Sequence, residues 1–178
     1  MPQFVAFLRA INVGGRNVTM AALRSHFEEL GLSQVETFIA SGNVLFESKA
    51  RNTTALEKKI EDHLETVLGY EVSTFVRSAA EVAAVAKTRP FTEAQMNAAA
   101  AFNVAFLTKP VEAKALERFQ TDIDDFRAEG REVYWLCRQK QSESTFSNKV
   151  FEKALGVRAT FRGLNTVEKL AAKMATKA

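Results

Sequence analysis

Residues 8–46 of the chain, LRAINVGGRNVTMAALRSHFEELGLSQVETFIASGNVLF, contain in succession a strand end, a glycine-bearing polar loop, a helix and a tight hairpin. Apolar side chains recur at helical spacing over residues 20–30, and Thr19 directly before them is a typical N-cap. Gly31 suits the left-handed conformation that often follows a helix. The hairpin is expected around Ala40-Ser41-Gly42, where turn-forming residues separate two apolar segments. This stretch therefore predicts half of a compact unit of strands and helices.

The rest of the first half completes a β-α-β-β-α-β order. Residues 4–9 are apolar and are flanked by loop residues, as a buried strand would be. A helix that opens with Thr54-Ala-Leu-Glu57, the spacing of a capping box, carries a buried apolar stripe and ends at Gly69. The remaining strands are expected at residues 35–39, 43–47 and 71–76. This order is that of the ferredoxin-like unit.

The same order recurs in the second half, after a short connector helix that opens at Ser78 and that Pro90 interrupts. The expected strands are residues 102–107, 123–128, 132–136 and 157–161. The expected helices are residues 110–120 and 145–155. A C-terminal helix is expected from Asn165, its predicted N-cap. The chain is therefore predicted to have an α+β fold of two ferredoxin-like β-α-β-β-α-β units in tandem, related by duplication. The first unit is assigned to residues 1–77. The second, with the connector helix and the C-terminal helix, is assigned to residues 78–178.

The composition is typical of a globular protein. Of the 178 residues, 47% are hydrophobic and 25% are charged, which excludes disordered and fibrous classes. Cys137 is the only cysteine, so the chain can form neither an internal disulfide framework nor a cysteine-only metal site. The sequence shows no signal peptide and no apolar run long enough to cross a membrane. A cytoplasmic location without a membrane partner is therefore expected.

Four segments carry a resemblance to a known family. They are the run over residues 8–46 quoted above, NVAFL at residues 103–107, REVYWL at residues 131–136 and FEKALGVRATFRGLNTVEKL at residues 151–170. Together they resemble the bacterial domain-of-unknown-function family numbered 1697, with INVGG and SGNV as the most distinctive parts. The resemblance spans nearly the whole chain. It implies a duplicated ferredoxin-like α+β protein of the bacterial cytoplasm, and it implies no established activity.

The loop after the first strand is the strongest candidate for a ligand site. Gly14 and Gly15 allow positive φ angles, so consecutive backbone N–H groups can turn toward one ligand just before the positive end of a helix. With arginines on both sides, this combination predicts binding of a small anionic or phosphate-bearing ligand. The contacts are assigned to Arg9, Asn12, Gly14, Gly15, Arg16, Asn17, Ser41 and Asn43. In the alternative interpretation the glycines only form a tight turn. Ser41 and Asn43 join the site only if the hairpin lies beside the loop.

Nucleic-acid binding is the second candidate function, because positive charge gathers toward the C-terminal end of the sequence. Residues 1–130 carry 14 basic and 17 acidic side chains, whereas residues 131–178 carry 10 basic and 4 acidic ones. The side chains that would contact phosphates are Arg131, Arg138, Lys149, Lys153, Arg158 and Arg162. A solvated lysine-rich helix surface accounts for the same charges. Tyr134 and Trp135 could stack on bases as aromatic residues of the RNA-recognition motif do, but packing in the core is the interpretation that we favour.

The sequence contains no complete catalytic or metal motif, so enzymatic activity is left open, as is the oligomeric state. His26 and His63 fall in separate helices without a cysteine or a carboxylate at ligand spacing, and no metal or cofactor is expected there. Cys137 is interpreted as a buried thiol rather than as a nucleophile. The aspartates within residues 121–125 are interpreted as solvated residues at the edge of a sheet.

Overall fold

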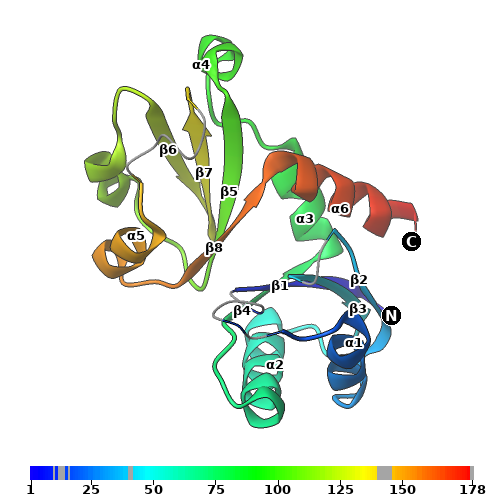
Figure 1. Ribbon diagram of the computed structural model, residues 1–178. Helices are drawn as coiled ribbons and strands as arrows, with labels where there is room; N and C mark the ends of the chain where they lie inside the picture. Colours follow the sequence, from blue (N-terminus) through cyan, green and yellow to red (C-terminus); the bar gives the residue numbers. More distant parts are fainter. Residues whose placement is uncertain (10, 12–14, 16, 40–41, 140–145, 177–178) are drawn as a thin grey trace. The chain divides into compact units, whose positions relative to one another are not determined.

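The computed structural model describes residues 1–9, 11, 15, 17–39, 42–139 and 146–176. It shows an α+β protein with two four-stranded antiparallel sheets and helices packed against them (Figure 1). The chain forms two compact units, one of Met1–Val85 with Glu168–Ala178 and the other of Ala86–Val167. In the part of the chain that the structure describes, no helix has the length and the apolar composition needed to cross a membrane.

The first unit is built on the sheet β2-β3-β1-β4, in which neighbouring strands run antiparallel. Its elements are β1 (Gln3–Leu8), α1 (Met20–Glu28), β2 (Ser33–Thr37), β3 (Asn43–Glu47), α2 (Thr53–Leu68) and β4 (Thr74–Ser78), with α3 (Ala79–Lys87) up to Val85 and α6 (Leu164–Thr176) from Glu168. Strand β1 pairs with β3 on one side and with β4 on the other, so it lies inside the sheet. A strand that is buried on both faces needs a continuous apolar run, and β1 provides one.

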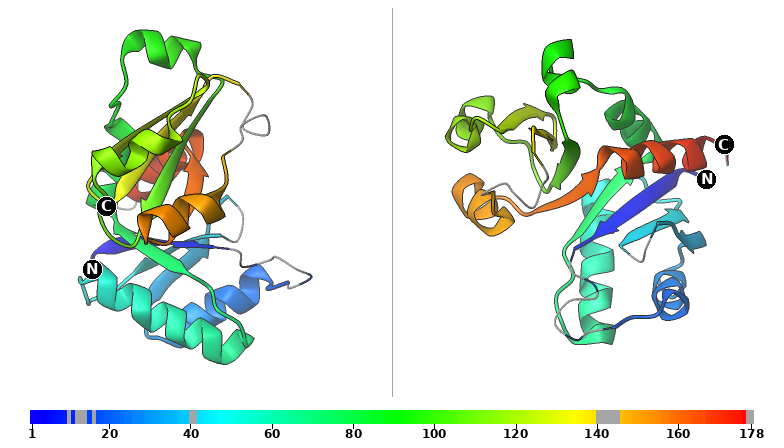
Figure 2. Two further views of the ribbon diagram at one scale, coloured as in Figure 1. Left: turned by 90° about the vertical axis from the view of Figure 1, so that its left-hand side faces the viewer. Right: turned by 45° about the horizontal axis from the view of Figure 1, so that its top comes forward.

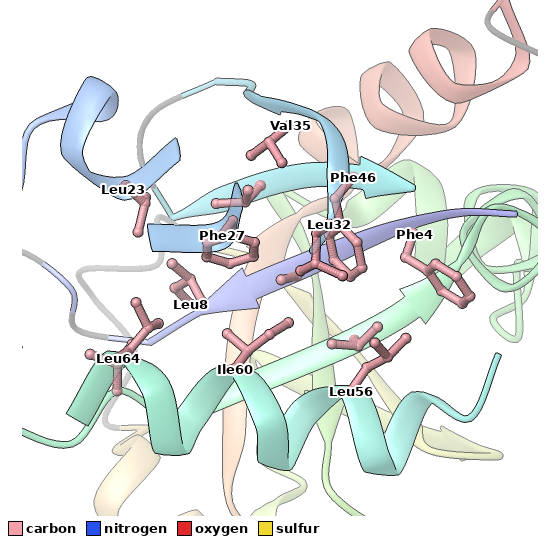
Figure 3. Close-up of a cluster of buried hydrophobic side chains, with 14 of the residues drawn as sticks. Phe4, Leu8, Leu23, Phe27, Leu32, Val35, Phe46, Leu56, Ile60 and Leu64 are labelled. Atoms are coloured by element: carbon pink, nitrogen blue, oxygen red, sulfur yellow. The ribbon is translucent and has the colours of Figure 1, made fainter. Parts of the chain in front are cut away.

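Helices α1 and α2, drawn in blue and in cyan to green, lie side by side on one face of this sheet (Figure 2). Figure 3 shows the core that they close over the strands, with Leu23 and Phe27 from α1 and Ile60 from α2 pointing toward the sheet. The ring centroid of Phe27 lies 5.9 Å from that of Phe46 in β3. Burial of each such side chain stabilises the folded state by about 1.5–3 kcal/mol.

The opposite face of the same sheet is also buried. Its side chains are Val5, Phe7, Leu45, Phe75 and Arg77, and none of them is more than 4% exposed. Helix α6 packs with this unit, since Lys173 Nζ lies 2.8 Å from Glu36 Oε1 of β2 and 5.3 Å from the ring of Phe38. The compact units therefore divide the chain differently from a boundary at residue 77. The apolar outer face of the first sheet needs a cover, and the amphipathic α6 buries Leu170 and Met174.

The second unit is built on the sheet β6-β7-β5-β8, again with antiparallel neighbours. Its elements are α4 (Glu93–Ala98), β5 (Ala101–Leu107), η1 (Ala113–Phe119), β6 (Asp124–Glu129), β7 (Glu132–Cys137), α5 (Asn148–Leu155) and β8 (Ala159–Gly163). Aromatic rings fill its core: Trp135 stacks on Phe126 with centroids 5.7 Å apart, and it lies 4.6 Å from Phe146. Tyr134 and Trp135 are each 2% exposed, so their predicted place in the core is confirmed.

Most of the expected helix ends are confirmed. Gly31, Gly69 and Gly156 all have positive φ angles, between +66° and +82°. The Ser78 capping box is present, with Ser78 N donating to Glu81 Oε1 at 2.9 Å and Glu81 N donating to Ser78 Oγ at 3.2 Å. These helix boundaries follow from local chemistry alone, which is why the sequence predicts them well.

Three local predictions are wrong. Helix α2 is capped by Asn52, whose Oδ1 accepts from Ala55 N at 3.0 Å, and not by Thr54. Glu57, which was expected to close a capping box with Thr54, is a buried residue inside the helix. The helix expected over residues 110–120 is the shorter 3-10 helix η1. Helix α6 begins at Leu164 directly after β8, so Asn165 lies inside the helix and is not its cap. In each case a tertiary contact or a short connection overrides the local pattern.

Candidate functional site

One end of the first sheet brings together the exit of β1, the β2–β3 turn and the start of β4. Leu8 N donates to Gly42 O at 2.8 Å, and Arg9 N donates to Ser73 O at 3.0 Å. Since β1 and β3 pair directly, the hairpin and the exit of β1 are neighbours. The described part of the hairpin, from Gly42 onward, therefore lies beside the exit of β1.

Helix α1 begins at this end of the sheet. Its N-cap is Thr19, as predicted, with Oγ1 accepting from Ala22 N at 3.0 Å. No acidic side chain lies in the first turn, so no carboxylate neutralises the partial positive charge at this end of the helix. In the preceding loop, Gly15 is exposed and has a φ of +80°, a conformation open to glycine. Tyr70 supports the loop, because its hydroxyl donates to Ile11 O at 2.8 Å.

A hollow of about 330 Å³ opens between the first turns of α1 and strand β2. It is lined by Met20, Ala21, Arg24, Glu36 and Thr37. Arg24 is exposed and brings a guanidinium group to the hollow, while Lys173 of α6 forms an ion pair with Glu36. The three charged side chains carry one net positive charge. The volume falls at the lower end of the range of small-molecule pockets, roughly 300–1,000 Å³.

The loop residues predicted to contact a ligand have separate outcomes. Asn12, Gly14, Arg16 and Ser41 lie outside the described residues. Gly15 and Asn17 are exposed, and Arg9 is half-buried, next to the end of β1. These three positions are accessible from solvent in the segment between β1 and α1, and none of them lines the hollow.

Asn43 has a structural role that the sequence did not separate from ligand binding. Its side chain is 3% exposed, and Nδ2 donates to Phe38 O at 3.1 Å and to Ile39 O at 2.8 Å. Both amide hydrogens therefore close the β2–β3 turn. Asn43 is better assigned to holding the hairpin in place beside the loop than to contacting a ligand.

The hollow itself was missed from the sequence. Met20 and Arg24 stand four residues apart, so they lie on one face of α1, but exposed residues at this spacing are common on any helix. Glu36 and Thr37 come from β2, and only the fold brings them to α1. The one local signal was an arginine close to a helix start that carries no acidic residue.

The basic residues proposed to contact nucleic acid are only partly available. Arg162 donates to Thr160 Oγ1 at 2.8 Å, and burial lowers the pKa of its guanidinium to about 10. Arg138 Nη2 lies 2.8 Å from Asp125 Oδ2. Arg131 is half-buried, and the exposed side chains of the set are those of Arg138, Lys149, Lys153 and Arg158. Two of the six predicted contacts, Arg131 and Arg162, are therefore partly buried, and Arg138 is held in an ion pair.

The aspartates of residues 121–125 are not all solvated, which corrects their interpretation as edge residues. Asp124 is buried, and its Oδ1 accepts from the indole N–H of Trp135 at 2.8 Å. Its Oδ2 accepts from Thr121 Oγ1 at 3.1 Å. A buried carboxylate is tolerated when donors satisfy it in this way. Cys137, in the same sheet, is a buried thiol, as expected.

The two histidines lie close together, although the sequence places them in separate helices. His26 Nδ1 is 3.1 Å from Glu29 Oε1, and His63 Nε2 is 3.4 Å from Glu29 Oε2. The ring centroids are 6.2 Å apart. The expectation that no carboxylate stands at ligand spacing is wrong, because Glu29 follows His26 by three residues, and the packing of α2 beside α1 brings His63 to the same carboxylate.

Comparison with known proteins gives a family and a fold. Residues 1–134 match the family described as a protein of unknown function, DUF1697. The structure is similar to that of the conserved bacterial protein SP0830 from Streptococcus pneumoniae, with a TM-score of 0.78 and 22% sequence identity. That likeness covers 98% of this chain and 99% of the other, and at this identity it concerns the fold alone. No curated protein matches the chain.

Proposed function

The chain belongs to the DUF1697 family, which has no known function, and from its own residues we propose that it binds a small anionic or phosphate-bearing ligand at the loop after β1. The observation that carries this proposal is the hollow at the first turn of α1, directly after the loop. The N–H groups of a helix start and a nearby guanidinium group are what an anion needs. The exposed Gly15 and Asn17 extend the same region toward solvent.

The lining of the hollow suggests which part of a ligand would lie where. Arg24 and the first turn of α1 offer positive charge and backbone donors to a phosphate or carboxylate group. Met20 and Ala21 offer apolar contact to an organic part of the ligand. Glu36 and Thr37 offer acceptors for hydroxyl or amino groups. A small phosphate ester therefore fits this site better than a bare inorganic anion does.

The test is a thermal-shift and calorimetric screen with inorganic phosphate, sulfate, nucleotides and sugar phosphates. A ligand at 100 times its dissociation constant should raise the free energy of unfolding by about 2.7 kcal/mol. Arg24→Gln should weaken binding by at least about tenfold, since a charge-assisted hydrogen bond contributes about 1.5–3 kcal/mol. Arg51→Gln, which changes an exposed arginine elsewhere in the unit, is the matched control. Absence of stabilisation by every ligand would count against the proposal.

We also propose that the two halves are ferredoxin-like units related by duplication, in a protein of the bacterial cytoplasm. The strand orders β2-β3-β1-β4 and β6-β7-β5-β8 support duplication, because equivalent strands occupy equivalent places. In both halves a helix follows the first strand and another follows the third. The single buried thiol, Cys137, suits a reducing compartment.

Nucleic-acid binding is a second, weaker candidate, supported by the exposed Lys149, Lys153 and Arg158 on and after α5. Three phosphate contacts would give a slope of about −2.7 in a plot of log affinity against log salt concentration on duplex DNA. Filter binding of short single- and double-stranded oligonucleotides at two salt concentrations measures this slope. No retention at low salt would exclude this candidate and leave the anion site untouched.

A further inference from the structure

We propose that His26, Glu29 and His63 form a binding site for one divalent transition-metal ion of the zinc type, shared between α1 and α2. The three residues are the metal-ligating cluster found in the described part of the chain. Each offers one ligand atom, and these atoms lie within 4.8 Å of one another. The site lies at the C-terminal end of α1, whereas the proposed anion site lies at its N-terminal end, so the two proposals are independent.

Helix geometry brings the three ligands together. His26 and Glu29 stand three residues apart at the end of α1, a spacing that puts both side chains on one face. His63 lies in α2, and both helices pack on the same face of the first sheet. The buried Phe27 and Ile60 fix the two helices against the sheet, so the imidazoles face each other on rigid elements.

The distances suit ligands of one ion. Two donors bound tetrahedrally at about 2.0–2.1 Å from a metal ion are about 3.3 Å apart. The separation of His26 Nδ1 from Glu29 Oε1 is 3.1 Å, and that of His63 Nε2 from Glu29 Oε2 is 3.4 Å. The two imidazoles meet opposite oxygens of one carboxylate, so binding of a single ion requires the Glu29 side chain, which is 48% exposed, to rotate between them.

One ring nitrogen of His63 is available to bind a metal ion. Its Nε2 is buried and has no hydrogen-bond partner, although Glu29 Oε2 lies within ion-pair distance. A buried imidazole nitrogen without a partner costs free energy, which a metal ion in the cluster would recover. The two imidazoles are each 20% exposed and the Glu29 side chain 48%. Solvent therefore reaches the cluster from the Glu29 side, where a water molecule would complete the coordination.

The electrostatics of this corner favour a cation. The carboxylate of Glu29 and the negative, C-terminal end of the α1 dipole both attract positive charge. Lys59 already lies at this end, since its Nζ donates to Leu30 O at 3.0 Å. Two imidazole nitrogens with one carboxylate oxygen suit Zn²⁺, Ni²⁺, Cu²⁺ or Fe²⁺, whereas Mg²⁺ and Ca²⁺ prefer sites made of oxygen atoms alone.

The experiment uses the untagged full-length protein and adds Zn²⁺. The chain has only two histidines, so its imidazole NMR spectrum contains two ring systems. Both rings should shift together and saturate at one equivalent of Zn²⁺, and neither should shift with Mg²⁺ or Ca²⁺. Calorimetry should show that His26→Gln, Glu29→Gln and His63→Gln each weaken Zn²⁺ binding by more than about tenfold.

Glu28→Gln is the matched control, because Glu28 is exposed on the same turn of α1 and lies outside the cluster. It should leave Zn²⁺ affinity unchanged. A shift of one ring alone, a response that does not saturate, or equal affinity in the Glu29 and Glu28 variants would overturn the proposal and leave a simple histidine–carboxylate pair. Should the histidine variants fail to fold, the ring shifts of the unmodified protein still decide the question.

Discussion

Glu57 of α2 and Arg77 of edge strand β4 form a buried ion pair in the first unit. Arg77 is fully buried, and its Nη1 lies 3.5 Å from Glu57 Oε2 and donates to Val76 O at 3.0 Å. The same Glu57 oxygen accepts from Val76 N at 2.8 Å. A buried pair of this kind stabilises little compared with a well-packed apolar pair, but removal of one partner costs more free energy than the pair contributes.

Glu57→Ala is therefore expected to lower the free energy of unfolding by about 3–5 kcal/mol. Glu57→Gln keeps an oxygen acceptor for Val76 N and should cost less. Urea denaturation followed by circular dichroism measures both variants. Glu65→Ala, an exposed position on the same helix, is the control and should change stability by less than about 0.5 kcal/mol. Equal losses at Glu57 and Glu65 would show that the pair is not buried in solution.

Tyr134 is a residue whose ionisation is tied to folding. Burial raises the pKa of its phenol from 10 to about 12, against a smaller opposing effect of its hydrogen bond with Thr88. The unfolded chain releases this proton near pH 10, while the folded protein keeps it until about pH 12. The contribution of Tyr134 to stability is thus complete below pH 10 and is lost as pH rises through 12.

A pH titration of phenolate absorbance should show one tyrosine that ionises only near pH 12. This late transition should be missing in Tyr134→Phe. The unfolding free energy of the unmodified protein should fall more steeply between pH 10 and 12 than that of the variant, by up to about 2–3 kcal/mol in total. Parallel pH profiles of the two proteins would contradict this assignment.

At the scale of elements, side chains rather than further strands satisfy the exposed edges of the sheets. Three alternate N–H groups of edge strand β4 donate to glutamates: Thr74 N to Glu61 at 3.1 Å, Val76 N to Glu57 at 2.8 Å and Ser78 N to Glu81 at 2.9 Å. An edge with unpaired N–H groups is a template for association with another chain. The glutamates of α2 and α3 block that association on the first sheet.

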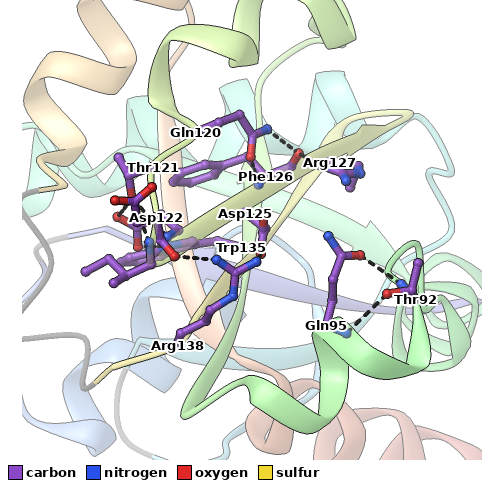
Figure 4. Close-up of polar contacts among 12 residues, drawn as sticks. Thr92, Gln95, Gln120, Thr121, Asp122, Asp125, Phe126, Arg127, Trp135 and Arg138 are labelled. Atoms are coloured by element: carbon purple, nitrogen blue, oxygen red, sulfur yellow. Dashed lines mark hydrogen bonds and ion pairs between the residues drawn. The ribbon is translucent and has the colours of Figure 1, made fainter.

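A single glutamine has the same role on edge strand β6 (Figure 4). Gln120 Oε1 accepts from Phe126 N at 3.0 Å, and its Nε2 donates to Phe126 O at 2.8 Å, as a neighbouring strand would. Gln120→Ala should lower the unfolding free energy by about 1–3 kcal/mol, because Phe126 N loses its acceptor, while Phe126 O keeps the hydrogen bond from Arg127 Nη1 at 2.8 Å. It should also increase aggregation, measured by light scattering on mild heating. Gln139→Ala, at an exposed glutamine, should do neither; the same behaviour in both variants would contradict this role for Gln120.

Elements were predictable from the sequence where one local contact decides them. The caps at Thr19 and Ser78 and the glycines that follow α1 and α2 are of this kind. Glu57 was misread because a glutamate at capping-box spacing looks the same whether it turns back to the helix start or reaches across to β4. The region 110–120 was misread because apolar spacing does not distinguish a 3-10 helix from an α-helix over so few residues.

At the scale of the whole molecule, the candidate sites depend on which elements become neighbours. The loop after β1 was found from its glycines and arginines, since these are consecutive in the sequence. The hollow beside it needs β2 next to α1, and the histidine cluster needs α1 next to α2. His26 and Glu29 stand three residues apart along the chain, but His63 joins them only across two helices. Sequence periodicity predicted both helices but not which of their faces would meet.

Helix α6 is far from the first sheet in sequence but belongs to the same compact unit. A substitution in α6 should therefore change the stability of strands that lie more than a hundred residues earlier in the chain. Leu170 of α6 is fully buried in the unit that contains residues 1–85. Leu170→Ala should lower the unfolding free energy by about 2–5 kcal/mol through the lost contacts and the cavity. Lys169→Ala, one residue earlier and exposed, should have little effect. Hydrogen exchange should show faster opening of amides in β1 and β3 of the Leu170 variant, while β5 and β7 keep their protection. Faster exchange in β5 and β7 instead would mean that α6 stabilises the second sheet and that the chain divides near residue 77 after all.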